Sequence, residues 1–214
     1  MILLGNSPLK LVLDAVFPRF CVNCQAEGSL LCAACQSEWW HEPPEPGSGH
    51  VAFFAYANPV VRKLICAWKY EYDLSAFEIL KAQAQDYLLE FIAGAKELGI
   101  QAVVPLPLSP KRLRERGFNQ SQMIADWIAP QLGVPVLDVL ARSHRAGHQA
   151  ERSPDEREQA MLNNPFHLIK TNSIPAKVLI VDDVWTTGAT MAAAKRVLET
   201  GEKTRVFGFT LAKG

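Results

Sequence analysis

The sequence predicts an α/β fold: an open, mostly parallel sheet flanked by helices, with a small cysteine-containing segment ahead of it. Short apolar runs rich in β-branched residues alternate with segments whose apolar residues recur at helical spacing. One such run, residues 178–181, leads into two aspartates, a loop of hydroxyl residues and a helix pattern. Four cysteines form two CxxC pairs near the N-terminal end. We therefore expect two parts, residues 1–48 and residues 49–214.

Composition limits the classes of function. The chain has 214 residues, of which 49% are hydrophobic and 21% charged, which suits one α/β domain plus a smaller segment. The net charge is zero, so nucleic acid could be bound only by a local patch and not by the protein's overall field. No apolar run approaches the roughly 20 residues of a membrane span, and the first 20 residues lack a signal-peptide cleavage site. We expect a cytoplasmic protein without membrane insertion.

The N-terminal segment predicts a metal site. Apolar residues at helical spacing predict a short helix over residues 9–17, which ends before Pro18. Two CxxC pairs follow, and their thiolates can close a tetrahedral, structural zinc site: Cys21, Cys24, Cys32 and Cys35. The alternatives are two disulfides, which a reducing cytoplasm disfavours, or four small core residues. Cys66 lies alone in a helical pattern and is expected to be buried. Residues 41–50, rich in Pro, Gly and Ser, predict the linker.

The rest of the chain alternates strands and helices. Asn58 and Pro59 form a helix start, and a long helix is predicted over residues 74–98, ended by Gly99. A further helix is expected to bury Met123, Trp127 and their apolar neighbours. Strands are predicted at residues 51–57, 102–106, 134–140, 166–169, 178–181 and 205–211.

The most basic segment follows the strand at residues 102–106. It contains Ser109, Lys111, Arg112 and Arg116. Charge runs are often only solvated turns. This one stands between a strand and a helix, which places it at the same sheet edge as the acidic loop, where guanidinium groups could bind pyrophosphate oxygens.

The loop after residues 178–181 predicts a ribose-phosphate site. At the carboxyl end of a parallel strand, the turn into a helix opens a crevice, and the first helical N–H groups make an anion site there. In the loop from residue 186 to residue 190, threonines can add hydroxyl donors, and glycine lets the backbone come close to a ligand. The residues of this loop are Thr186, Thr187, Gly188, Ala189 and Thr190. Asp182 and Asp183 suit sugar hydroxyls rather than phosphate. The alternative is a plain strand–turn–helix with solvated acids.

Residues 141–158 form a long polar segment without clean periodicity. A loop of this length is either a functional lid, which would exclude water from a reaction at ribose, or a plain loop, and the sequence favours neither. His144 and His148 are expected to be solvated rather than catalytic.

Residues 178–190 resemble the signature of type I phosphoribosyltransferases, which bind phosphoribosyl pyrophosphate. With the double CxxC, the Pro-Leu-Pro-Leu-Ser-Pro-Lys-Arg turn and the stretch Arg-Gly-Phe-Asn-Gln at 116–120, the chain resembles the ComF family of competence-related proteins. This resemblance implies a phosphoribosyltransferase-like fold, a zinc-binding N-terminus and a link to the uptake or use of external DNA. Two positions depart from the family pattern: Tyr72, where glycine is frequent, and Ala160, where asparagine is usual, although Gln149 and Arg157 are kept.

Three hypotheses follow. The first is a ComF-type protein that binds phosphoribosyl pyrophosphate and supports DNA uptake or utilisation, with single-stranded DNA and other DNA-uptake proteins as candidate partners. The second is a nucleobase salvage enzyme, although no base-holding hood is evident. The third is a zinc-containing adaptor without catalysis. A DNA role predicts exposed aromatic side chains near the basic segment, for which the candidates are Trp39, Trp40 and Phe118.

Whether the chain is catalytic is left open by the sequence. A reaction would displace pyrophosphate from the anomeric carbon, with magnesium bridging the leaving group. Asp182 and Asp183 would then orient the ribose, and Lys111, Arg112 and Arg116 would offset the charge of the leaving pyrophosphate. The acceptor and the oligomeric state are not evident from the sequence.

Overall fold

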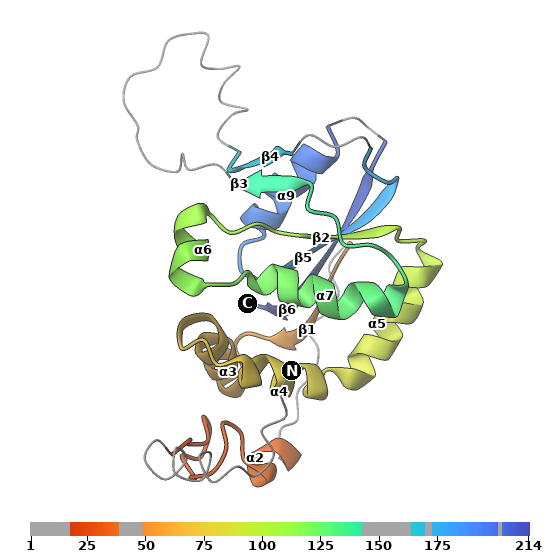
Figure 1. Cartoon of the computed structure of the whole chain (residues 1–214). Helices are drawn as coiled ribbons and strands as arrows, with labels where there is room; N and C mark the ends of the chain where they lie inside the picture. Colours follow the sequence, from red (N-terminus) through yellow and green to blue (C-terminus); the bar gives the residue numbers. More distant parts are fainter. Residues whose placement is uncertain (1–17, 39–48, 143–163, 170–172, 201–202) are drawn as a thin grey trace. The chain divides into compact units, whose positions relative to one another are not determined.

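A computed structural model describes residues 18–38, 49–142, 164–169, 173–200 and 203–214 (Figure 1). The helix expected at residues 9–17, Trp39, Trp40 and most of the expected lid, including Gln149, Arg157 and Ala160, lie outside these described residues. None of the described helices is long and apolar enough to cross a membrane.

The chain divides into two compact units, and each is built from two separate stretches of sequence. The first unit comprises Met1–Glu42 and Ala57–Gln83, and the second comprises Pro43–Tyr56 and Ala84–Gly214. The second unit therefore begins with a strand that stands, in sequence, between the two stretches of the first.

A four-stranded parallel sheet forms the centre of the second unit. Its order is β1-β6-β5-β2, and every neighbouring pair is parallel. The strands are β1 (His50–Ala55), β2 (Ala102–Pro105), β5 (Lys177–Trp185) and β6 (Arg205–Lys213). Their interiors are apolar and fully buried, as expected of parallel strands covered on both faces. The predicted α/β class is confirmed.

Helices cover both faces of this sheet (Figure 1). Alternate residues of the strands, such as Val104 and Ile180, pack with Ala194 and Leu198 of α9 (Ala189–Leu198). On the other face, the Phe53 ring lies 5.7 Å from that of Phe91 in α5 (Gln85–Glu97) and 6.2 Å from that of Trp127 in α7 (Gln120–Leu132). The alternation of strand side chains thus builds two separate apolar layers.

Short elements complete the second unit. The basic segment forms α6 (Pro110–Arg116), a helix where the sequence analysis expected a turn. Strands β3 (Leu140–Arg142) and β4 (Phe166–Leu168) form an antiparallel ladder in which Arg142 pairs with Phe166.

The first unit packs its cysteine segment and α2 (Ala33–Ser37) with two helices. Helix α3 (Pro59–Tyr70) begins as predicted, because the Asn58 side chain accepts hydrogen bonds from the backbone N–H groups of Val60 and Val61. Helix α4 (Leu74–Gln83) follows, and the rings of Trp68 and Phe77 stack between the two helices with centroids 4.5 Å apart.

Three predicted elements differ from those in the structure. The helix expected over residues 74–98 is divided into α4 and α5 at Ala84, whose φ of −89° and ψ of 1° leave the helical region. Residues 134–140 are not a strand. Pro135 has no N–H to donate, and the segment joins β2 only through a bridge between Val136 and Val103. Strand β5 extends to Trp185, four residues beyond the predicted end.

Candidate functional site

The acidic pair lies inside β5, and the side chain of Asp182 is held in place. One of its carboxylate oxygens accepts a hydrogen bond from Ser121 Oγ at 2.8 Å and another from the Asp183 N–H at 2.9 Å. Ser121 is buried in the first turn of α7. Asn119 caps that helix, and its amide also donates to the Leu106 carbonyl at 3.0 Å. The start of α7 therefore positions Asp182, a role for Ser121 that the sequence analysis missed.

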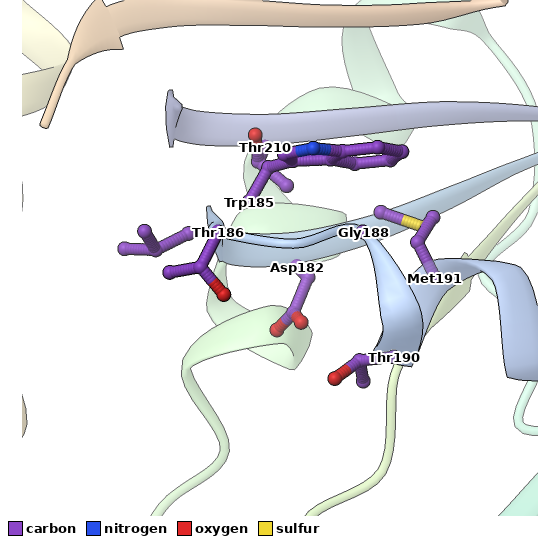
Figure 2. Close-up of a pocket in the computed structure, with 8 residues that line it drawn as sticks. Asp182, Trp185, Thr186, Gly188, Thr190, Met191 and Thr210 are labelled. Atoms are coloured by element: carbon purple, nitrogen blue, oxygen red, sulfur yellow. The ribbon is translucent and has the colours of Figure 1, made fainter. Parts of the chain in front are cut away.

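The predicted phosphate loop connects β5 to α9. Gly188 is the N-cap of α9 and has a left-handed backbone, with φ of 74°, which favours glycine. Thr186, Thr187 and Thr190 are exposed. A pocket brings Asp182 and this loop together (Figure 2). Its lining consists of Asp182, Val184, Trp185, Thr186, Gly188, Thr190, Met191 and Thr210.

The basic segment is organised by its caps. The Ser109 hydroxyl oxygen accepts a hydrogen bond from the Arg112 N–H at 3.3 Å, and left-handed Gly117 ends the helix. Lys111 and Arg112 are exposed. Arg116 is partly buried and donates to the Gln120 side chain at 3.2 Å. The cations thus stand on a short, defined helix, and Ser109 serves as its N-cap.

Arg142 is a further cation near the acidic pair. Its guanidinium carbon lies 5.3 Å from the centroid of the Phe166 ring, which is buried beneath it. Burial lowers the pKa of Arg142, the positive charge of Arg112 lowers it further, and Asp182 opposes both. Arg142 is therefore close enough to both Arg112 and Asp182 to interact with each of them electrostatically. The sequence analysis counted Arg142 only among the residues of the polar loop, because its pairing with Phe166 is long-range.

The four cysteines of the two CxxC pairs come together in the first unit. Their sulfur atoms all lie within 4.8 Å of one another. All four are free thiols, so the disulfide alternative is not what the structure shows. Sulfur atoms around one tetrahedral zinc are about 3.8 Å apart, given Zn–S bonds near 2.3 Å. The arrangement therefore fits a metal ion with four thiolate ligands. Cys66 is free and partly buried on α3.

Two of these thiols differ in acidity. Burial by itself would raise the pKa of Cys21, but the N–H groups of Cys24, Cys32 and Asn23 lower it to about 6. At Cys35 the Asn23 amide favours the thiolate, but the neighbouring sulfur atoms and burial prevail and raise the pKa to about 12. Four thiolates cannot all be held this close without a cation to compensate their charge.

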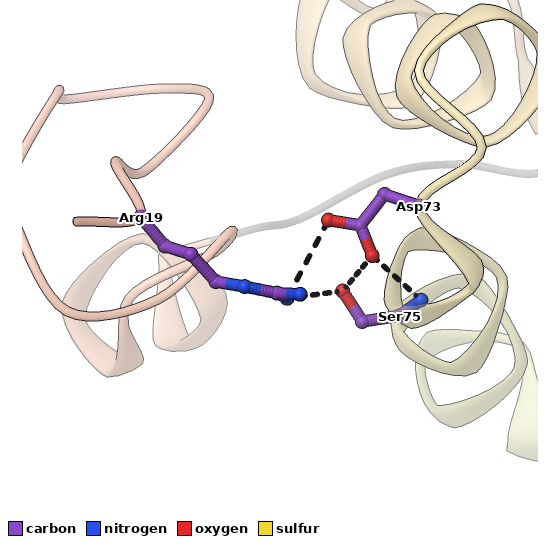
Figure 3. Close-up of polar contacts among 3 residues, drawn as sticks. All are labelled: Arg19, Asp73 and Ser75. Atoms are coloured by element: carbon purple, nitrogen blue, oxygen red, sulfur yellow. Dashed lines mark hydrogen bonds and ion pairs between the residues drawn. The ribbon is translucent and has the colours of Figure 1, made fainter. Parts of the chain in front are cut away.

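The cysteine segment is fastened to α3 and α4. Lys63 on α3 donates to the Val22 carbonyl at 2.6 Å. Arg19 donates to Ser75 Oγ at 2.9 Å and pairs with Asp73 at 3.4 Å (Figure 3). Asp73 in turn accepts from the Ser75 hydroxyl and N–H at the start of α4. Leu31 adds an apolar contact layer with Val60 and Ile79.

Comparisons with known proteins identify proteins that are similar to this chain. Residues 119–212 match the family model described as phosphoribosyl transferase domain. The chain is 33% identical to competence protein ComFC of Streptococcus pneumoniae, over 94% of this chain and 85% of that protein. It is 29% identical to DNA utilization protein YhgH of Salmonella typhimurium, over 81% of this chain and 73% of that protein. Among solved structures, adenine phosphoribosyltransferase from Saccharomyces cerevisiae has a TM-score of 0.39 at 20% identity. The match covers 86% of this chain and 90% of that one.

Proposed function

Because the chain belongs to the ComF/ComFC family of competence proteins, we propose that its second unit binds phosphoribosyl pyrophosphate and so supports the uptake or use of external DNA. The observation that carries the proposal is the pocket at the end of β5, which places a fixed carboxylate beside an exposed hydroxyl loop at a helix start. Carboxylates accept hydrogen bonds from a sugar diol, and the loop N–H groups suit a phosphate.

The proposal gives separate roles to the acidic pair, the hydroxyl loop and two of the cations. Asp182 and Asp183 hold the ribose hydroxyls, and residues 186–190 hold the 5-phosphate. Arg112 and Arg142 offset the charge of the pyrophosphate, since Arg142 lies within electrostatic reach of both Arg112 and Asp182. Magnesium, bound with the ligand, would supply further charge compensation there.

The test compares the ligand affinity of the parent protein with that of a variant in which both aspartates are replaced. The Asp182→Asn/Asp183→Asn variant should bind phosphoribosyl pyrophosphate with magnesium about ten- to a hundredfold more weakly, because a charge-assisted hydrogen bond contributes about 1.5–3 kcal/mol. Calorimetry measures the affinity, and circular dichroism confirms folding. Asp86→Asn/Asp126→Asn is the matched control, since both carboxylates are exposed on α5 and α7. A folded acidic-pair variant that binds as tightly as the parent would refute the proposal.

Whether the bound ligand reacts is decided by a turnover screen. Nucleobases and oligonucleotides are offered to the parent protein with phosphoribosyl pyrophosphate, and release of pyrophosphate is measured. Release with a single base would support the salvage alternative. Binding of single-stranded DNA without release of pyrophosphate would support a ComF-type binding protein that does not catalyse transfer.

We also propose that Cys21, Cys24, Cys32 and Cys35 hold one structural zinc ion. Four sulfur ligands leave no open position for a substrate, so such an ion stabilises the first unit and takes no part in chemistry. The support is the clustering of four free thiols within 4.8 Å.

A further inference from the structure

Trp185 lies against the backbone of the phosphate loop. It is the last residue of β5, and its indole extends toward Gly188 (Figure 2). A Cβ atom built at Gly188 would lie 2.3 Å from Cζ2 of this indole and 2.8 Å from Cε2. No side chain can occupy that space while the indole is there. The left-handed backbone and the ring contact therefore both require glycine at the N-cap of α9.

His50 packs on the same indole. The two ring centroids are 4.1 Å apart with an interplanar angle of 36°. His50 is 5% exposed, and its Cδ2 would lie 3.0 Å from a Cβ at Gly208, so a second glycine makes room for this ring. The two aromatic residues come from β1 and β5, the strands on either side of β6.

Thr210 of β6 fixes the orientation of His50. Its hydroxyl donates to the Ala212 carbonyl at 3.0 Å and lies 3.1 Å from His50 Nε2. A hydroxyl has one proton to donate, so His50 Nε2 is the donor to Thr210 Oγ1. Burial, aided by Lys213, lowers the pKa of His50 to about 4 and keeps the ring neutral near pH 7. The His50 ring that packs against Trp185 is therefore uncharged.

The loop itself has few internal constraints. Within residues 186–190 of the described chain, the Ala189 N–H donates to Thr187 Oγ1 over a long distance of 3.4 Å. The threonine side chains of the loop are exposed. Gly188 is restrained on its C-terminal side by the hydrogen bond that its carbonyl accepts from the Ala192 N–H at 2.9 Å, and on its Cα by contact with the indole. The conformation of Gly188 sets the direction of the first N–H groups of α9.

We propose that Trp185, supported by His50 and Thr210, is a positioning residue that holds Gly188 and the loop in the conformation that binds a ribose 5-phosphate. The inference rests on the proposed function of that loop. It assigns a role to residues outside the acidic pair and the phosphate loop. The indole acts through the backbone of Gly188, so its effect should be specific to the 5-phosphate and should leave pyrophosphate, which is bound by the cations of α6 and β3, unaffected.

The experiment compares two ligands on one set of variants. Calorimetry measures the dissociation constants of ribose 5-phosphate and of magnesium pyrophosphate for the parent, Trp185→Leu and Trp185→Phe. Trp185→Leu should weaken ribose 5-phosphate about tenfold or more and change pyrophosphate less than twofold. Trp185→Phe keeps an aromatic ring against Gly188 and should recover most of the affinity. Equal losses for both ligands, or no loss for either, overturn the inference.

A second pair of variants serves if Trp185→Leu does not fold. Thr210→Val keeps the size of the side chain but removes the hydrogen bond to His50, and should weaken ribose 5-phosphate several-fold. His50→Phe keeps a ring against Trp185 and should bind nearly as the parent does. A folded Thr210→Val variant that binds ribose 5-phosphate as tightly as the parent overturns the inference. A parent that binds neither ribose 5-phosphate nor phosphoribosyl pyrophosphate refutes the proposed function instead.

Discussion

At the scale of single residues, Tyr72 stands out by its backbone. Its φ of 58° lies in the left-handed region, where side chains other than glycine are strained. Glycine would adopt this backbone without that strain. The aromatic side chain is 51% exposed, so little burial offsets the strain.

We therefore expect Tyr72→Gly to raise the free energy of unfolding by about 0.5–1 kcal/mol. Glycine removes the strain of the left-handed backbone, and this gain is partly offset because glycine has more conformational freedom in the unfolded chain. Chemical denaturation measures it. Tyr70→Gly is the matched control: Tyr70 is also exposed but ends helix α3, where glycine should lower stability by a similar amount. Equal effects of the two substitutions would contradict the assignment of strain to Tyr72.

His50 gives the second unit a pH dependence. Burial, and then Lys213, lower its pKa from 6.5 to about 4 in the folded state. The unfolded chain therefore takes up this proton first, and stability is lost as the pH falls from about 6.5 toward 4. Between pH 7 and pH 5 the loss should be on the order of 2 kcal/mol, at about 1.4 kcal/mol for each pH unit below the unfolded pKa of 6.5.

Denaturation at pH 7 and pH 5 measures this effect, and His50→Phe is the comparison. The variant should lose less stability than the parent between the two pH values, because phenylalanine takes up no proton. The same loss in both proteins would show that other groups cause the pH dependence.

At the scale of elements, α6 presents a short row of cations. Lys111, Arg112 and Arg114 are exposed, and the ion pair between Lys111 and Glu115 is a long one at 3.9 Å. Exposed pairs of this kind contribute little, so the cations keep most of their attraction for a polyanion.

Arg112→Ala/Arg116→Ala should thus weaken binding of pyrophosphate-bearing ligand and of single-stranded DNA, and should flatten the salt dependence of the latter. Affinities at 50 and 200 mM salt measure both. The control is Arg196→Ala, which removes an exposed cation from the last turn of α9. If the α6 variant and the control behave alike, the row is only a solvated face.

Sequence patterns predicted the elements better than their limits. Periodicity located the buried strands and α7, because burial on fixed faces leaves a repeat in the sequence. It failed at Ala84, where alanine continues a helical pattern and no glycine or proline marks the end of the helix. The chemistry of Asp182 was evident from its motif, whereas Ser121 and Arg142 join it through contacts between distant segments, which no local pattern records.

At the scale of the whole molecule, the four-cysteine cluster is central to how the cysteine segment of the first unit is held together. Cys21 and Cys35 form a small apolar cluster with Leu31, so the packing of the segment and the sulfur cluster are one structure. A segment with so small an apolar cluster would depend on the proposed metal ion for stability.

Metal analysis of purified protein should find about one zinc ion per chain, the number that four thiolates in one tetrahedral site can hold. Cys24→Ser should lower the zinc content and the melting temperature, because it removes one ligand. Cys66→Ser, on α3 outside the cluster, should change neither. Equal zinc contents in parent and Cys24→Ser would rule out the site.

The position of β1 in the sheet has a consequence for synthesis. His50 and its partner Thr210 are 160 residues apart in the chain, yet their strands are neighbours. A nascent chain therefore carries β1 unpaired until β6 has left the ribosome, and closing so long a loop is slow. During that interval the apolar residues of β1, including Phe53 and Phe54, have no sheet to join. The strand that supports the phosphate loop is thus among the first to be made and the last to be placed.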